Sequence, residues 1–263
     1  MNILETIIER KKSEVRLKKA SASIDDLEKT PFFQRSPLSL RSFLLDQSKT
    51  GIIAEFKRKS PSKGDINVQA NVVEITTAFT NYGASGLSVL TDLPFFGGVS
   101  EDLINARINE IPILRKDFVI DEYQIIESKS IGADVILLIA ACLTPKKVEQ
   151  LASFAKDLGL EVILEIHEEE ELGHICTQTD IVGINNRDLK TFTVSIDRSL
   201  KMAQKIPVDR IKIAESGIHS VENIVIFKRN GFNGFLIGEN FMKEKNPAIA
   251  FASFVNKLKT VSS

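Results

Sequence analysis

Residues 134–166, DVILLIAACLTPKKVEQLASFAKDLGLEVILEI, contain one structural unit from which the fold class can be predicted. The apolar, β-branched runs 134–139 and 161–166 are typical of buried strands. Residues 144–158 between them have the periodicity of a helix. A strand, a helix and a second strand in this order predict a βα unit of a parallel sheet.

Similar apolar runs recur along the chain and favour a closed barrel. A (β/α)8 barrel has eight strands in about 250 residues, close to the 263 here, whereas an open doubly wound sheet usually has about five or six strands. No GxGxxG or GxxxxGK[ST] motif favours the open sheet. We therefore predict an α/β protein, a single (β/α)8 TIM barrel. Its strands are expected at 52–56, 86–90, 112–114, 134–139, 161–166, 181–184, 211–214 and 234–237.

Residues 1–48 precede the repeat and form a predicted helical extension. Ser23 followed by Asp26 marks one helix start, and Pro37 is expected to open a helix over 38–45. The apolar spacing of the segment requires a surface to cover. We expect a cap that closes over the mouth of the barrel, with 49–263 forming the barrel and 1–263 a single domain.

Composition limits the classes of function. With 43% hydrophobic and 26% charged residues, the chain has the balance of a globular protein, and its formal charge of −1 argues against nucleic-acid binding. Arg10, Lys11 and Lys12 are expected on the solvent-exposed face of an amphipathic helix. Cys142 and Cys176 lack a CxxC spacing, which indicates neither a disulfide framework nor a cysteine zinc cluster. We expect a cytoplasmic protein that binds no membrane. We also expect it to be a monomer or a weak homo-oligomer.

Charged residues at the strand ends are the candidate catalytic groups, because such barrels carry their active sites there. Glu55 and Lys57 share a face with Ile53, since strand side chains alternate. Other polar groups end or follow later strands, and we expect them to converge at the mouth. A single such charge at a strand end is more often a solvated loop residue or half of a structural ion pair. They are Lys116, Glu165, Asn185, Arg187 and Glu215.

Glycine turns after the last two strands indicate a phosphate site. Ser216–Gly217 and Gly238–Glu239 can offer backbone N–H groups to an anion, although each could be an ordinary turn. The basic loop 57–64, which includes Ser60, adds donors at the same rim. It is weak evidence for nucleic acid because no aromatic residues are interleaved. A phosphorylated small molecule is the expected partner.

Residues 167–174, HEEEELGH, resemble a metal helix only superficially. The spacing is not HExxH, and glutamates at a helix start favourably meet its positive dipole end. We expect a solvated first turn and no metal.

Six motifs follow one another along the chain: IAEFKRKSPS at 53–62, LRKDF at 114–118, Glu165, GINNRDL at 183–189, AESGI at 214–218 and LIGE at 236–239. In this order they resemble the indole-3-glycerol phosphate synthase family of tryptophan biosynthesis. The likeness extends from the N-terminal helix to the last barrel helix. One departure is Val99, where the family usually has a small polar residue.

The resemblance implies conversion of 1-(2-carboxyphenylamino)-1-deoxyribulose 5-phosphate to indole-3-glycerol phosphate, carbon dioxide and water, without a cofactor or metal. Lys116 matches the family's general acid and Glu165 its base. Glu55 and Lys57 match the pair that handles the hydroxyl and carboxylate, and the division of acid duties between Lys57 and Lys116 stays open. Substrate-orienting or phosphate-binding positions are Asn185, Glu215, Ser60, Arg187, Ser216, Gly217, Gly238 and Glu239.

Two rival functions remain at this point. A related isomerase of a neighbouring biosynthetic step would use a cysteine and an aspartate near strand ends, but Cys142 follows the fourth strand without a partner signature. A non-catalytic barrel retained for binding would have no need to keep both Lys116 and Glu165.

Overall fold

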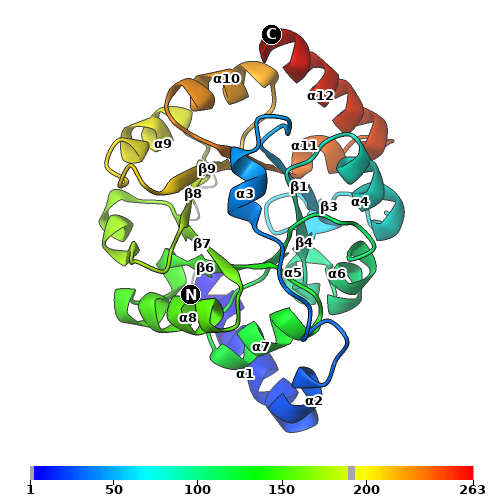
Figure 1. Ribbon diagram of the computed structural model, residues 1–263, viewed down its shortest axis with the longest axis vertical. Helices are drawn as coiled ribbons and strands as arrows, with labels where there is room; N and C mark the ends of the chain where they lie inside the picture. The colour runs from blue at the N-terminus through cyan, green and yellow to red at the C-terminus, as the bar shows by residue number, and fades with distance from the viewer. Residues whose placement is uncertain (1–2, 189–192, 263) are drawn as a thin grey trace.

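The computed structural model describes residues 3–188 and 193–262 and forms the predicted closed barrel (Figure 1). All eight strands are parallel, in the order β1-β10-β9-β8-β7-β6-β5-β4. Leu189, the last residue of the 183–189 motif, lies outside the described residues. The barrel strands are β1 (Ile52–Phe56), β4 (Gly86–Leu90), β5 (Ile113–Lys116), β6 (Val135–Ile139), β7 (Glu161–Ile166), β8 (Ile181–Asn185), β9 (Ile211–Glu215) and β10 (Gly234–Ile237).

Helices surround the barrel. Those that follow the strands are α4 (Val72–Asn81), α6 (Ser100–Ala106), α7 (Glu122–Ser130), α8 (Pro145–Asp157), α9 (Ile196–Ala203), α10 (Val221–Arg229) and α12 (Pro247–Ser262). Shorter elements are the β2 (Lys59–Ser60) and β3 (Gly64–Asp65) hairpin, α5 (Leu93–Phe96), η1 (Ala140–Cys142), η2 (Glu169–His174) and α11 (Glu239–Met242). The predicted helix 144–158 is confirmed, because Thr144 caps α8 by accepting the Lys147 N–H. No helix in the described ranges is long and apolar enough to cross a membrane.

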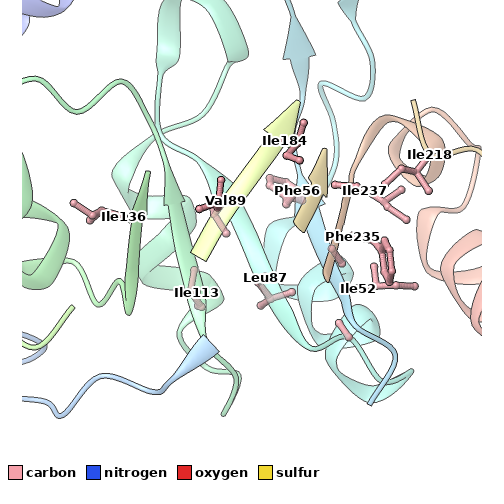
Figure 2. Packing of buried hydrophobic residues seen from close by; sticks show 14 of the residues in the cluster. Ile52, Phe56, Leu87, Val89, Ile113, Ile136, Ile184, Ile218, Phe235 and Ile237 are labelled. Carbon is pink, nitrogen blue, oxygen red and sulfur yellow. The ribbon is translucent and has the colours of Figure 1, made fainter. Parts of the chain in front are cut away.

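Two apolar cores follow from strand alternation. Inward side chains such as Ile53, Leu114 and Ile213 fill the barrel, while outward side chains of the same strands pack beneath the helices. Figure 2 shows part of the outer core, including Phe56 of β1 and Val89 of β4. Because both strand faces are buried, the sequence shows continuous apolar runs.

Three strands extend further than predicted. The third was expected to end at 114, but β5 continues to Lys116, and β8 and β9 each gain one residue, Asn185 and Glu215. Pairing holds these ends in place, since Lys116 is registered with Leu90 and Asn185 with Glu215. Charged and amide side chains are rarely buried. Strand ends predicted from apolar residues alone therefore stop before these polar residues.

The N-terminal segment is divided between the two ends of the barrel. It forms α1 (Ile3–Ser21), α2 (Ile24–Glu28) and α3 (Leu40–Leu45), and Figure 1 shows α3 in front of the barrel's centre. A Cβ on Gly86, the first residue of β4, would lie 2.8 Å from Leu40 Cδ1, and one on Gly234 of β10 would lie 3.0 Å from Leu44 Cδ2. The α3 helix therefore closes the amino-terminal end of the barrel. The expectation that the whole segment closes the mouth is wrong for α3.

The two predicted helix starts in this segment differ in outcome. Ser23 and Asp26 form a reciprocal capping box at α2, as expected. The helix at 38–45 begins later than predicted, because Ser39 caps α3 through the Ser42 N–H and Pro37 lies outside it.

A buried ion cluster attaches α1 to the opposite end, the mouth. Lys11 is 1% exposed, and its Nζ lies 2.9 Å from Asp117 Oδ1, 3.1 Å from Asp92 Oδ2 and 2.8 Å from Glu14 Oε2. Asp92 lies two residues after the end of β4, and Asp117 follows β5 directly. The expectation that Lys11 lies on the solvent-exposed face is wrong, because these two aspartates draw the ammonium inward. Arg10 and Lys12 are exposed as expected.

Candidate active site

The predicted site residues meet in one cavity at the carboxyl-terminal ends of the strands. In several strands the inward-facing apolar side chains are followed by a polar residue at the mouth, because side chains alternate along a strand; in β1, Ile53 is followed on the same face by Glu55 and Lys57. The residues that line the cavity include all those singled out from the sequence: Glu55, Lys57, Ser60, Lys116, Glu165, Asn185, Arg187, Glu215, Ser216, Gly217, Gly238 and Glu239.

Lys116 is the centre of the charged cluster. Its Nζ lies 2.6 Å from Glu165 Oε2 and 3.1 Å from Glu215 Oε2, so the ammonium bridges the ends of β7 and β9. Asn185 between them donates its amide to Glu165 Oε1 at 3.0 Å. At the carboxyl-terminal end of β1, Lys57 Nζ lies 2.8 Å from Glu55 Oε1. Two lysine–glutamate pairs from different strands thus face one space.

Two glycines make room for the carboxylates. A Cβ on Gly183 of β8 would lie 2.2 Å from Oε1 of Glu215. One on Gly238, directly after β10, would lie 2.6 Å from Oε1 and 2.8 Å from Cβ of Glu55. These glycines are required by close approach of the glutamates, since a side chain at either position would displace them.

Burial and neighbouring charges separate the acid–base properties of the cluster. Burial would lower the pKa of Lys116, but Glu165, Glu215 and Glu55 raise it well above its usual range. Burial likewise opposes ionisation of Glu165, yet Lys116 and His167 hold its pKa well below the ordinary value. Burial, aided by the Glu165 and Glu55 charges and opposed by Lys116, raises the pKa of Glu215 to about 7. At neutral pH the cluster therefore holds an ammonium, one firmly ionised carboxylate and one that is partly protonated.

Glycine turns form another part of the cavity wall. Ser216 and Gly217 have φ of 65° and 68°, both in the left-handed region, and the Asn186 amide donates to the Ser216 carbonyl at 2.7 Å. Gly238 and Glu239 lie at the start of α11. Arg187 Nη2 lies 3.7 Å from Glu239 Oε2. Left-handed backbone at a residue other than glycine is uncommon and is retained only where surroundings impose it.

Apolar residues that the sequence analysis did not single out complete the cavity. Ile3, Leu4 and Ile7 of α1 line it together with Leu137 and Ile139 of β6. The signal was present in the apolar residues near the start of α1. It could not be assigned to the site because the docking of α1 depends on contacts distant in sequence.

An apolar cavity with convergent lysines, glutamates and glycine turns at the mouth of a (β/α)8 barrel defines a class, the barrel enzymes of phosphorylated small molecules. The model of one such family, described as "Indole-3-glycerol phosphate synthase", matches residues 4–254. A protein of that name from Bacteroides thetaiotaomicron is 45% identical over 258 residues, 98% of this chain and 99% of its own. One from Salinibacter ruber is 39% identical, covering 96% and 94%. The chain belongs to the indole-3-glycerol phosphate synthase family.

Solved structures agree on the fold. The tryptophan synthase alpha subunit of Legionella pneumophila superposes with a TM-score of 0.61 at 13% identity, over 84% of this chain and 97% of that one. KGPDC from Streptococcus mutans gives a TM-score of 0.61 at 15% identity, over 81% and 98%. At such identities the likeness shows the barrel alone.

Membership in this family argues against both rival functions, the isomerase and the non-catalytic barrel. The enzyme is a carboxy-lyase of tryptophan biosynthesis that acts on a phosphorylated small molecule. The isomerase alternative depended on a cysteine, and burial, together with Glu165 and Glu171, raises the pKa of Cys142 to about 12. That thiol stays protonated at neutral pH and is a poor proton-transfer group.

Proposed function

We propose that the lysine–glutamate pairs perform the acid–base steps of indole-3-glycerol phosphate formation, with Lys116 as general acid and Glu165 as general base. The observation that carries this proposal is the 2.6 Å contact between Lys116 Nζ and Glu165 Oε2 in the cavity wall. As the aryl carbon attacks the substrate carbonyl, Lys116 donates a proton to the oxygen that becomes a hydroxyl. In a partly dry site such a donor stabilises the developing charge strongly.

The later steps restore aromaticity. Carbon dioxide leaves from the ring carbon that formed the new bond, and its bonding electrons return to the ring. Glu165 then removes a proton from the ring carbon next to the one that bears the new hydroxyl. That hydroxyl leaves as water, which requires a second proton donor. We propose Lys57 for that donation, because it enters from β1 and is paired with Glu55 rather than with the Lys116 cluster. Asn185 and Glu215 orient the substrate around these groups.

The proposed substrate position follows the cavity wall. The phosphoryl group binds the turn amides of Ser216–Gly217 and Gly238–Glu239, with Ser60 and Arg187 beside it. The apolar aryl ring packs against Ile3, Leu4 and Ile7 of α1, where burial of carbon surface favours binding.

The alternative is that Lys116 and Glu165 are only a structural ion pair. The decisive experiment adds the carboxyphenylamino-deoxyribulose phosphate and follows indole absorbance for wild type, Lys116→Met and the control Lys205→Met, whose side chain is 50% exposed. Loss of the proton donor should lower turnover by roughly 10²- to 10⁴-fold with substrate still binding. Near-normal turnover of folded Lys116→Met protein would contradict the mechanism, and melting temperatures measured in parallel reveal a purely structural effect.

We also propose that the enzyme works in the cytoplasm as a monomer or weak homo-oligomer and does not bind nucleic acid. The near-neutral charge and the two separate cysteines support this. Sedimentation velocity with and without duplex DNA tests the oligomeric state and the absence of nucleic-acid binding.

A further inference from the structure

His167 is buried behind the Glu165 carboxylate. It is 4% exposed, so the expected solvated turn at 167–174 is wrong for this residue. Because strand side chains alternate, His167 projects on the same side as Glu165, two residues further along. Glu165 is among the described residues that line the cavity and His167 is not. Any effect of His167 on the reaction therefore acts through Glu165.

A carboxylate faces each nitrogen of the His167 ring. Nε2 lies 3.1 Å from Glu165 Oε1, and Nδ1 lies 3.7 Å from Glu171 Oε2. Glu171 is fixed in place, since the same oxygen accepts the backbone N–H of His167 at 2.6 Å. Neither ring nitrogen has a hydrogen-bond partner of normal geometry in the described ranges.

This arrangement selects the protonation state of the ring. A neutral imidazole has a lone pair on one nitrogen, and here that lone pair would face a carboxylate oxygen, which also has only lone pairs. The imidazolium presents N–H to both carboxylates. The other titratable groups near the ring are compatible with an imidazolium. Burial keeps the Cys142 thiol of η1 protonated, and Lys116 lies at the other oxygen of Glu165. Glu215 lies beyond Lys116 and adds negative charge.

The pKa of His167 supports the same state. Burial alone would lower it, but contacts with Glu165 and Glu171 raise the pKa of His167 to about 9. The ring is therefore charged at neutral pH.

We propose that His167 is a positioning residue which, as an imidazolium held between Glu165 and Glu171, keeps Glu165 ionised so that the shared proton stays on Lys116. The inference rests on the proposed acid and base roles. The competing event is transfer of a proton from Lys116 Nζ to Glu165 Oε2, which turns the ion pair into a neutral amine and a carboxylic acid. That transfer destroys the acid and the base together.

His167 opposes this proton transfer while substrate is bound. A bound substrate expels water from the cavity, and loss of solvation favours the neutral pair. The imidazolium lies outside the cavity wall and keeps its charge throughout. Asn185 donates to the same Oε1, so a cation and an amide hold one oxygen while Oε2 faces Lys116. After Lys116 protonates the substrate, Glu165 has lost one cation but not both, and it remains a carboxylate until it takes up the proton from the ring.

Nuclear magnetic resonance titration of the substrate-free protein tests the charge state directly. The chain has only three histidines, so His174→Asn and His219→Asn variants assign the His167 ring signals by elimination. We expect His167 to titrate at a pH of about 9. Glu171→Gln removes one flanking carboxylate and should move that midpoint down by about one unit. Titration at or below the ordinary value of about 6.5 would overturn the proposal.

The pH dependence of turnover tests the consequence. In His167→Asn the pKa of Glu165 should rise, so the acidic fall in kcat should begin about one pH unit higher, with little change in KM. His174→Asn is the control, because its half-buried ring contacts the Leu143 carbonyl at 2.9 Å; its profile should match wild type. A His167→Asn profile that coincides with wild type, or an equal loss at every pH, contradicts the proposal. If wild type fails to convert the substrate, the proposed function fails instead, and the titration still decides the charge of His167.

Discussion

Replacement of Lys11 by methionine should undock the first half of α1 from the barrel mouth. Lys11 is 1% exposed, and its partners Asp92 and Asp117 are 2% and 3% exposed. Removing one member of a buried ion pair costs about 3–5 kcal/mol, because the remaining charges are left without compensation. Methionine keeps most of the side-chain volume, so the effect reports mainly the charge.

The cost should appear in binding more than in global unfolding. The second half of α1 has separate attachments, since Lys18 pairs with Glu127 at 2.8 Å and Tyr123 donates to the Lys18 carbonyl at 3.1 Å. The first half carries Ile3, Leu4 and Ile7 into the cavity. If as little as about 1.4 kcal/mol of the penalty must be recovered from substrate binding, KM rises about tenfold.

The assay is steady-state kinetics with melting temperatures, and the matched control is Lys12→Met. Lys12 is the next residue on the same helix, and its side chain is 59% exposed in a pair with Glu9, so its loss should cost less than about 1 kcal/mol. Lys11→Arg, which retains the charge, should recover part of the affinity. Equal KM and melting temperature in Lys11→Met and Lys12→Met would refute the idea that the buried cluster holds α1 at the mouth.

Three further outcomes follow from the cavity. Glu165→Gln keeps the shape of the side chain but not the base, and single-turnover traces should show ring closure proceeding while the later proton removal is slowed; slowing of closure alone would contradict the assignment. Gly238→Ala brings a Cβ within 2.6 Å of Glu55 Oε1, so both phosphate affinity, measured by calorimetry, and turnover should fall. Burial opposes ionisation of Asp117, but Arg115 and Lys11 hold its pKa well below normal, so stability should be lost in acid denaturation as pH falls below about 4; a Lys11→Met curve with the same acid limb would argue against this source.

The sequence was sufficient for the barrel and for its polar mouth because both depend on local patterns. Apolar runs at regular spacing gave the strands, and alternation placed Glu55 and Lys57 on the inward face. The longer reach of β5 was missed because Arg115 reads as a surface residue, although it is fully buried between Asp117 and Glu127.

Contacts distant in sequence account for what was missed. Lys11 stands between Arg10 and Lys12 in a basic run, and only the approach of Asp92 and Asp117 from two strands explains its burial. His167 opens a run of glutamates that suggests a wet turn, but Glu165 and Glu171 enclose it. The position of α3 at the far end depends on Gly86 and Gly234, whose missing side chains make room for two leucines.

Glu215 should be a residue whose loss stabilises the fold while it impairs the reaction. Burial raises its pKa to about 7, above the ordinary glutamate value near 4.3, so the folded protein prefers the protonated form. The cost of the carboxylate therefore grows as pH rises from about 4 to about 7 and is constant above that, at a value on the order of 3 kcal/mol. Glu215→Gln removes that cost, and Lys116 keeps its partner Glu165 at 2.6 Å. We expect the variant's melting temperature to exceed that of wild type at pH 8 and to approach it at pH 5, with turnover reduced at both. A variant less stable than wild type at pH 8 would mean that the contact with Lys116 outweighs burial, and that the site carries no stored electrostatic strain at this position.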